Sequence, residues 1–229
     1  MLFLFLTMAL PHTFSPGTPA KSAEVNENFN YLSNNIPFNN IKVYDDPAEN
    51  PQTFVVPAGV NRLIVECVGG GAGGSAQSLS GAQNCRRAQS GGAGGYCLKM
   101  IVVSPEDEIT VNVGAGGQQG SSGQSPGNGG TSNFGTFCSA VGGQTGGDGG
   151  SGVDGDLNFD GGEGLSFYQF SSNTCGMGNS GGRSVLGRYG EGGRGAVALG
   201  VGGSTSAVSS GQAGKAGAVI VKWFGTGYD

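Results

Sequence analysis

The sequence predicts an all-β protein: a short N-terminal helix followed by a glycine-rich β domain with extended segments of the polyglycine II type. Of the 49 glycines, 45 lie between Gly69 and Gly217, many recur at every third residue, and strand-like stretches alternate with them. A left-handed extended helix has three residues per turn and makes no internal hydrogen bonds. A row of glycines along one edge therefore lets neighbouring helices approach and bond to each other.

The every-third-residue spacing occurs in two sets. The first set is Gly114, Gly117, Gly120 and Gly123, and the second is Gly143, Gly146, Gly149, Gly152 and Gly155, resumed at Gly161 and Gly164. Composition alone produces about one four-member run, so the longer set carries more weight. Collagen is excluded, because Pro126 is the only proline between Gly114 and Gly217. A disordered linker is the alternative, but a linker has no use for the strand patterns.

The N-terminal part, residues 1–46, is predicted to be an attachment and oligomerisation segment. Thr18 and Pro19 suit the N-cap and first position of a helix, which we expect at about residues 19–36. Its apolar residues follow the spacing of a short heptad seam that three chains could share: Val25, Phe29, Leu32 and Ile36. An ordinary amphipathic helix packed on its own domain is the alternative.

The N-terminal ten residues are apolar but too short to span a bilayer, and no positive flank precedes them. We therefore expect no membrane insertion and another subunit covering these side chains. Whether the mature chain begins at Met1 or Met8 stays open.

The glycine-rich β domain is expected over residues 50–229. Strand patterns occur at residues 53–56, 62–68, 97–103, 108–113, 134–141 and 216–224. The turn residues Ser104-Pro105-Glu106-Asp107 predict a hairpin between the third and fourth of these.

Two islands poor in glycine, residues 165–175 and 183–189, interrupt the second half of this domain. Glycine-edged helices that pack laterally place their connecting residues at the ends, so we predict distal loops at 165–189. The receptor-binding candidates in them are Phe167, Tyr168, Phe170, Arg183, Arg188 and Tyr189. The alternative is that these aromatic residues plug the end of the bundle.

Several stretches carry a family resemblance: residues 91–96 (GGAGGY), 108–117 (EITVNVGAGG), 127–135 (GNGGTSNFG), 54–60 (FVVPAGV) and 217–223 (GAVIVKW). They resemble the glycine-rich domain of bacteriophage tail fibres. Residues 11–14 (PHTF), 16–21 (PGTPAK) and 24–29 (EVNENF) are similar to tail-fibre attachment regions. The departures from the family are the five cysteines and the apolar leader before Met8.

The resemblance implies a virion component, commonly a homotrimer, that joins other phage tail or baseplate proteins through its N-terminus. Some phage adhesins of this style carry a polyglycine-helix sandwich whose loops bind the host receptor. We therefore expect a structural protein of the phage tail fibre or tail tip that presents distal loops to a glycan or outer-membrane protein. The alternatives are a purely structural tail component and a non-viral polyglycine bundle, such as an ice-binding protein or a receptor ectodomain.

The sequence predicts no enzymatic activity and no cofactor. His12 is the only histidine, so no Ser-His-Asp or Cys-His arrangement forms within the glycine-rich domain. Matches to GxGxxG arise about twice by chance in so glycine-rich a chain, and no βαβ pattern surrounds them. The net charge of −5 offers no basic surface for nucleic acid.

Two sets of potential metal ligands occur, and neither predicts a metal site. Oxygen ligands alternate along the chain at Asp154, Asp156, Asn158 and Asp160, and such ligands could hold a hard cation. The match to an EF-hand loop fails, because Phe159 stands where that loop needs glycine. A solvated acidic loop is the alternative. The cysteines, at positions 67, 85, 97, 138 and 175, are odd in number and lack CxxC spacing. We expect them to be reduced and partly buried.

Overall fold

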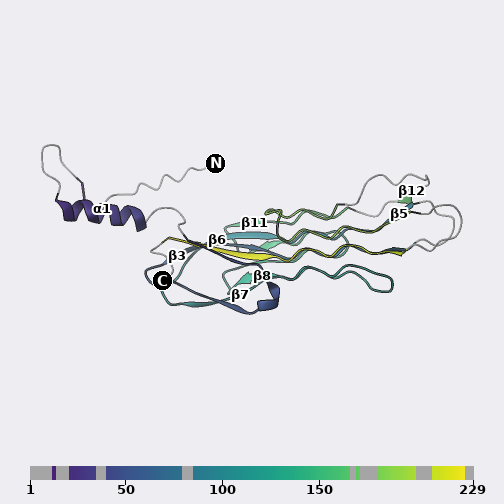
Figure 1. Ribbon diagram of the computed structural model, residues 1–229, viewed down its shortest axis with the longest axis horizontal. Helices are drawn as coiled ribbons and strands as arrows, with labels where there is room; N and C mark the ends of the chain where they lie inside the picture. The colour runs from purple at the N-terminus through teal and green to yellow at the C-terminus, as the bar shows by residue number, and fades with distance from the viewer. Residues whose placement is uncertain are drawn as a thin grey trace.

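The computed structural model describes residues 12–13, 21–34, 40–78, 85–165, 169–170, 180–199 and 208–224. Within these ranges there is one α-helix, α1 (Ser22–Asn34), which lies inside the predicted span of 19–36, and one short 3-10 helix, η1 (Pro47–Glu49). The rest of the described chain is strands and extended segments (Figure 1). The predicted all-β fold with a short N-terminal helix is confirmed.

Two five-stranded antiparallel sheets form a sandwich in the described chain. The first sheet has the strand order β1 (Asn40–Tyr44), β15 (Ala218–Trp223), β3 (Arg62–Val68), β6 (Tyr96–Val102), β11 (Leu157–Phe159). The second sheet has the order β10 (Gly152–Val153), β9 (Cys138–Ala140), β8 (Ser132–Phe134), β7 (Glu108–Asn112), β2 (Gln52–Val55). Alternate residues of the other eight strands face inward, whereas the edge strands β10 and β11 contribute none, so the two sheets share one hydrophobic core.

Aromatic side chains fill the centre of this core. The ring of Phe54 packs edge-on against Trp223 at 5.5 Å and lies 5.8 Å from the ring of Phe134, and all three side chains are fully buried. Each aromatic side chain of this size removes a large apolar area from water, and the tilted contacts add to that gain. These three residues tie β2 and β8 of one sheet to β15 of the other.

Two strand predictions need correction. Strands β6 and β7 do not form a hairpin, because β6 pairs along seven residues with β3 while β7 pairs with β2 and β8. The turn between them crosses from one sheet to the other, and Glu106 adopts a positive φ of 67° there. Residues 134–141 are not one strand either, since β8 and β9 form a hairpin with the turn between Phe134 and Cys138.

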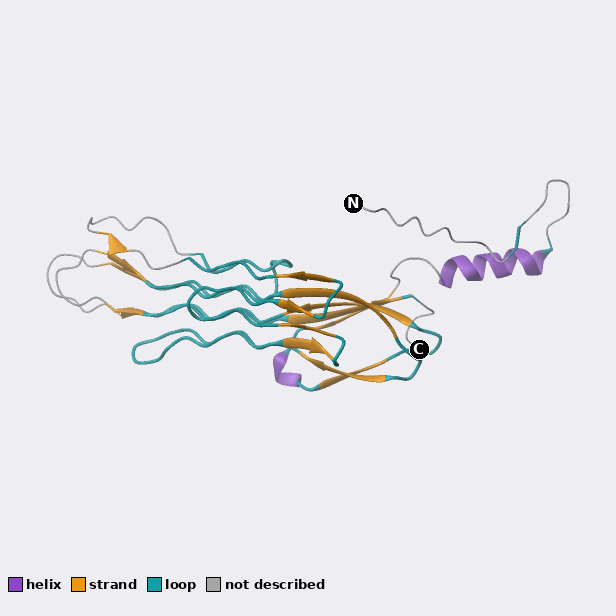
Figure 2. Ribbon diagram, turned by 180° about the vertical axis from the view of Figure 1, so that it is seen from behind, coloured by secondary structure: helices purple, strands orange, loops and turns teal. Residues whose placement is uncertain are grey.

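Beyond one end of the sandwich the chain continues as extended glycine-rich segments that run side by side (Figure 2). In the described part of the chain there are ten of them: residues 69–75, 88–95, 114–120, 127–130, 141–144, 147–150, 161–165, 180–183, 190–196 and 211–217. Most of them continue a sandwich strand directly; residues 69–75, for example, follow β3. We call this array the glycine bundle.

The segment 69–75 lies at the centre of six others. Its N–H groups donate to three neighbours in strict rotation, with N···O distances of 2.8–3.0 Å: residues 69, 72 and 75 to segment 88–95, residues 70 and 73 to 127–130, and residues 71 and 74 to 211–217. Its carbonyl groups accept from three more segments: 114–120, 141–144 and 190–196. Three residues per turn and six bonded neighbours are the geometry expected of packed polyglycine helices.

The segment 88–95 is a second centre with six bonded neighbours of its own. They are segments 69–75, 141–144, 147–150, 161–165, 180–183 and 190–196. The eight outer segments bond to one another in chain order, from 114–120 round to 211–217, and the last bonds back to the first. The chain therefore lays down two inner segments and then winds once around them.

This lattice explains the glycine content. A Cβ built on most bundle glycines would lie about 2 Å from a backbone atom of a neighbouring segment, closer than real contacts allow. In the set beginning at Gly114, residues 114, 117 and 120 are buried against the inner segment 69–75. The set beginning at Gly143 does not follow one helix, because the chain reverses between 141–144 and 147–150.

Candidate functional site

The end of the glycine bundle far from the sandwich carries small β-structures, which we call the tip (Figure 1). In the described chain the tip consists of two small sheets. The first has three strands in the order β12 (Gln169–Phe170), β5 (Cys85–Arg87), β13 (Val197–Leu199). The second has two strands, β14 (Val208–Ser209) and β4 (Gln77–Ser78). The two inner segments lead straight into β4 and out of β5. The tip is therefore mounted on the most enclosed part of the bundle.

An open depression of about 420 Å³ lies partway along the bundle, where the outer segments 114–120 and 127–130 are joined by a turn. It is lined by Ser75, Ala76 and residues 121–126. Ser121, Ser122 and Ser125 contribute hydroxyl groups and Gln124 an amide, so the lining offers donors and acceptors on small side chains. Such a lining suits a hydroxyl-rich ligand better than an apolar one.

The receptor-binding residues predicted from the sequence do not lie together. The backbone of Phe170 belongs to β12 at the tip, whereas Phe167 and Tyr168 lie outside the described residues. The hydroxyl of Tyr189 donates to the Asp45 carboxylate at 3.2 Å, next to β1 of the sandwich. Arg188 lies over the Tyr189 ring, and Arg183 is exposed. The 165–189 stretch is therefore not one distal loop, because residues 184–189 turn at the sandwich end.

The acidic set at residues 154–160 is used for local structure. It connects β10 to β11, with Asp154 at a positive φ of 60°. The carboxylate of Asp156 accepts from the Met100 N–H at 2.8 Å, and the Asn158 amide bonds both backbone groups of Gly155. Asp160 is exposed. Among the described residues, none of these three aspartates belongs to a group of three or more His, Cys, Asp or Glu side chains whose ligand atoms lie close enough to share a metal ion.

The predicted oligomerisation seam is only partly described. Val25 is half-buried in α1, Phe29 and Leu32 belong to its backbone, and Ile36 lies outside the described residues. A preceding part of the same chain contacts this helix, since the Asn28 side-chain amide bonds both backbone groups of His12. The trimer stays a prediction. None of the described helices has the length and apolarity needed to cross a bilayer.

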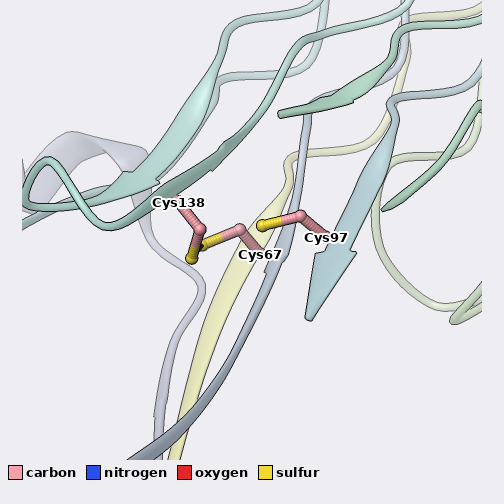
Figure 3. A group of neighbouring side chains, drawn as sticks. All are labelled: Cys67, Cys97 and Cys138. Atoms are coloured by element: carbon pink, nitrogen blue, oxygen red, sulfur yellow. Dashed lines mark hydrogen bonds between the residues drawn. The ribbon is translucent and has the colours of Figure 1, made fainter. Parts of the chain in front are cut away.

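Three cysteine thiols converge inside the sandwich, although their spacing in the sequence does not indicate it (Figure 3). Cys67 of β3 and Cys97 of β6 are register partners in one sheet, and Cys138 of β9 reaches them from the other. The three sulfur atoms lie within 4.8 Å of one another, with 3.7 Å between those of Cys67 and Cys138. All three side chains are buried and free of disulfides.

The thiols of this cluster influence each other's ionisation. Hydrogen bonds from Cys138 and Cys67 lower the pKa of Cys97 well below its usual range, against the effect of burial. The pKa of Cys67 is raised by its hydrogen bonds to Cys138 and Cys97 and by burial. One thiolate in the cluster is thus stabilised by two thiol donors, as expected for strongly interacting sites.

On the outer face of the same sheet, Glu66 is buried between two donors. Its carboxylate accepts from the Tyr96 hydroxyl at 2.8 Å and from the Lys222 ammonium group. Burial, followed by the hydrogen bond to Glu66 and its negative charge, raises the pKa of Tyr96 above its usual range. Tyr96 therefore stays protonated in the folded chain at pH values where it ionises in the unfolded chain.

This difference predicts alkaline destabilisation. The unfolded chain loses the Tyr96 proton near pH 10, so stability should fall above about pH 10 by up to about 1.4 kcal/mol per pH unit. Urea unfolding at stepped alkaline pH measures the slope, and Tyr96→Phe should reduce it. Tyr189→Phe is the comparison variant. Burial and the hydrogen bond to Asp45 raise the pKa of Tyr189 as well, but less than that of Tyr96, so this variant should reduce the slope less than Tyr96→Phe does. Equal slopes for the wild type and Tyr96→Phe would contradict the assignment.

Comparison with known families agrees with the architecture. No curated protein matches the chain. A glycine-rich domain model matches residues 47–228, which include every described sandwich strand except β1 and all ten segments of the glycine bundle. The chain therefore belongs to the glycine-rich domain family.

Proposed function

We propose that this chain is a structural protein of a phage tail fibre or tail tip, and that its tip contacts a receptor on the host surface. The observation that carries the proposal is the double-centred glycine bundle, which holds the tip away from the sandwich on ten mutually bonded segments. Backbone bonding in every direction makes such a bundle stiff. Loops on a stiff scaffold tolerate sequence change, which suits recognition of variable receptors.

The chemistry of the far half of the molecule supports a glycan or a polar protein loop as the receptor. The described depression beside the bundle is lined by hydroxyl and amide groups. Single contacts of this kind are weak, but several copies on one particle multiply their effect. In this proposal the N-terminal segment with α1 attaches the chain to other tail or baseplate proteins as a homotrimer. The end of the predicted segment 1–46 belongs to the sandwich instead, because β1 (Asn40–Tyr44) pairs with β15.

The test combines localisation with adsorption. Antibody labelling should find the chain at the tail end of intact particles. Particles carrying Arg86→Ala with Arg87→Ala in β5 should adsorb to host cells at least about tenfold more slowly, if these residues contribute to a receptor contact. Arg183→Ala with Arg188→Ala is the matched control, because Arg188 lies at the sandwich end and should leave adsorption unchanged.

The outcomes separate the alternatives. Absence of the chain from the particle would overturn the proposal. A tail location with normal adsorption of the Arg86/Arg87 variant and of a further tip variant, Phe170→Ala, would favour the purely structural role.

A further inference from the structure

The geometry of the cysteine cluster matches that of ligands around a single metal ion. Thiolates at the usual metal–sulfur distance of about 2.3 Å lie about 3.8 Å apart at a tetrahedral angle and about 4.0 Å apart at a trigonal one. The Cys67 and Cys138 sulfurs are 3.7 Å apart, and no pair exceeds 4.8 Å. An ion can therefore be placed between the three sulfurs with little movement of the strands.

We propose that Cys67, Cys97 and Cys138 bind one Cu(I) ion in a closed three-coordinate site. Thiolate ligands select soft ions such as Cu(I), Zn²⁺ and iron–sulfur clusters over hard cations. Closed zinc sites take four ligands, whereas the described residues place three His, Cys, Asp or Glu ligand atoms together here. Cu(I) needs no fourth ligand, and the sulfurs are buried from water.

A neighbouring ammonium group offsets part of the negative charge of the site. Lys99 follows Cys97 on the same face of β6, and its ammonium group donates to the Phe137 carbonyl at 2.8 Å, beside Cys138. One Cu(I) bound by three thiolates has a net charge of −2, and the Lys99 ammonium group beside the site reduces this to −1. Each ligand that is a thiol before binding releases its proton to solvent, and every sulfur stays in its reduced state.

The position of the site gives the ion a mechanical role. Cys67 and Cys97 stand one residue from the ends of β3 and β6, where the two inner glycine segments begin and end. Cys138 belongs to the opposite sheet. A bound ion would join the two sheets at the junction between the sandwich and the glycine bundle, and a ligand that binds only the folded chain raises its stability.

The experiment titrates the reduced full-length chain with Cu(I) under anaerobic conditions, in competition with bicinchoninate. We expect one Cu(I) per chain, a thiolate-to-copper charge-transfer band and a higher thermal midpoint. Cys138→Ser should weaken Cu(I) binding by more than about 100-fold, because it removes a ligand rather than a supporting group. Cys85→Ser, in β5 at the tip, is the matched control and should bind as the wild type does.

A second measurement avoids the risk that the Cys138 variant fails to fold. Alkylation of the partly unfolded wild-type chain, followed by peptide mass analysis, should show Cu(I) protecting Cys67, Cys97 and Cys138 but not Cys85. Unchanged Cu(I) affinity in Cys138→Ser, equal protection of Cys85, absence of stoichiometric binding, or preferential binding of Zn²⁺ would each overturn the proposal. A disulfide between two of the three cysteines in the purified protein would also overturn it.

Discussion

Gly92→Ala should destabilise the folded chain by about 3 kcal/mol or more, measured by urea or thermal unfolding. Gly92 lies in the inner segment 88–95, where its N–H donates to Gln144 and its carbonyl accepts from Ala72. A Cβ at this position would lie 1.8 Å from the Asp148 carbonyl oxygen and 2.4 Å from its carbon. Because the obstructing atoms are backbone, and that backbone is bonded to further segments, no rotamer change can relieve the clash.

Gly127→Ala is the matched control for this prediction. Gly127 lies in an outer segment, where an added Cβ would lie 3.1 Å from the Cγ of the Gln118 side chain and 3.2 Å from the Gln118 backbone nitrogen. The side chain can move, the outer segment needs to shift by only a few tenths of an ångström, and alanine reduces the freedom of the unfolded chain, so we expect a change within about 1 kcal/mol. Equal losses in the two variants would show that the inner segments are not enclosed as the lattice requires.

The sequence predicted the kind of backbone in the glycine bundle but not its arrangement. A three-residue period follows where one edge of a helix faces the interior of the bundle, and residues 114, 117 and 120 of an outer segment obey it. An inner segment touches six neighbours, so its glycines fill every phase and leave no period, as residues 69–71 show. Which segments become inner depends on contacts far apart in the chain, and no local pattern records them.

The strand patterns located most of the sandwich strands but missed β1, β10 and β11, and the pairing depended on competition between partners. The turn at Ser104–Asp107 has hairpin composition, yet β6 bonds β3 over seven residues and leaves β7 to the other sheet. The cysteine cluster was hidden for the same reason. Cys67 and Cys97 share the inward face of adjacent strands, but only the packing of the two sheets brings Cys138 to them.

The position of the glycine-poor islands could not be read from composition. Both islands interrupt the glycine-rich segments, and composition alone predicts both at the distal end of the bundle. A segment that returns to the sandwich also needs a turn, and Ser184 closes this one by donating to the Tyr189 carbonyl. Arg188 and Tyr189 thus lie near the sandwich, while the backbone of Phe170 pairs with β5 at the tip.

Trp223→Ala should cost about 3–5 kcal/mol, the second large effect expected in this chain. The Trp223 side chain is fully buried between the sheets and packs edge-on against Phe54. Removal of the indole leaves a cavity that the surrounding Phe and Val side chains cannot fill without strain. Trp223→Phe keeps a ring against Phe54, so its loss in free energy of unfolding should be clearly smaller. This variant allows the loss to be measured if the alanine variant does not accumulate.

Met100→Ala is the control on the outer face of the same sheet, where the Met100 side chain is 64% exposed, and it should change stability by no more than about 0.5 kcal/mol. Because β15 continues directly from the outer segment 211–217, and β3 leads into the inner segment 69–75, damage at Trp223 should loosen both parts together. We therefore expect one cooperative unfolding transition in Trp223→Ala and in Gly92→Ala. Two separate transitions, with only one shifted by each variant, would show that the sandwich and the glycine bundle fold independently.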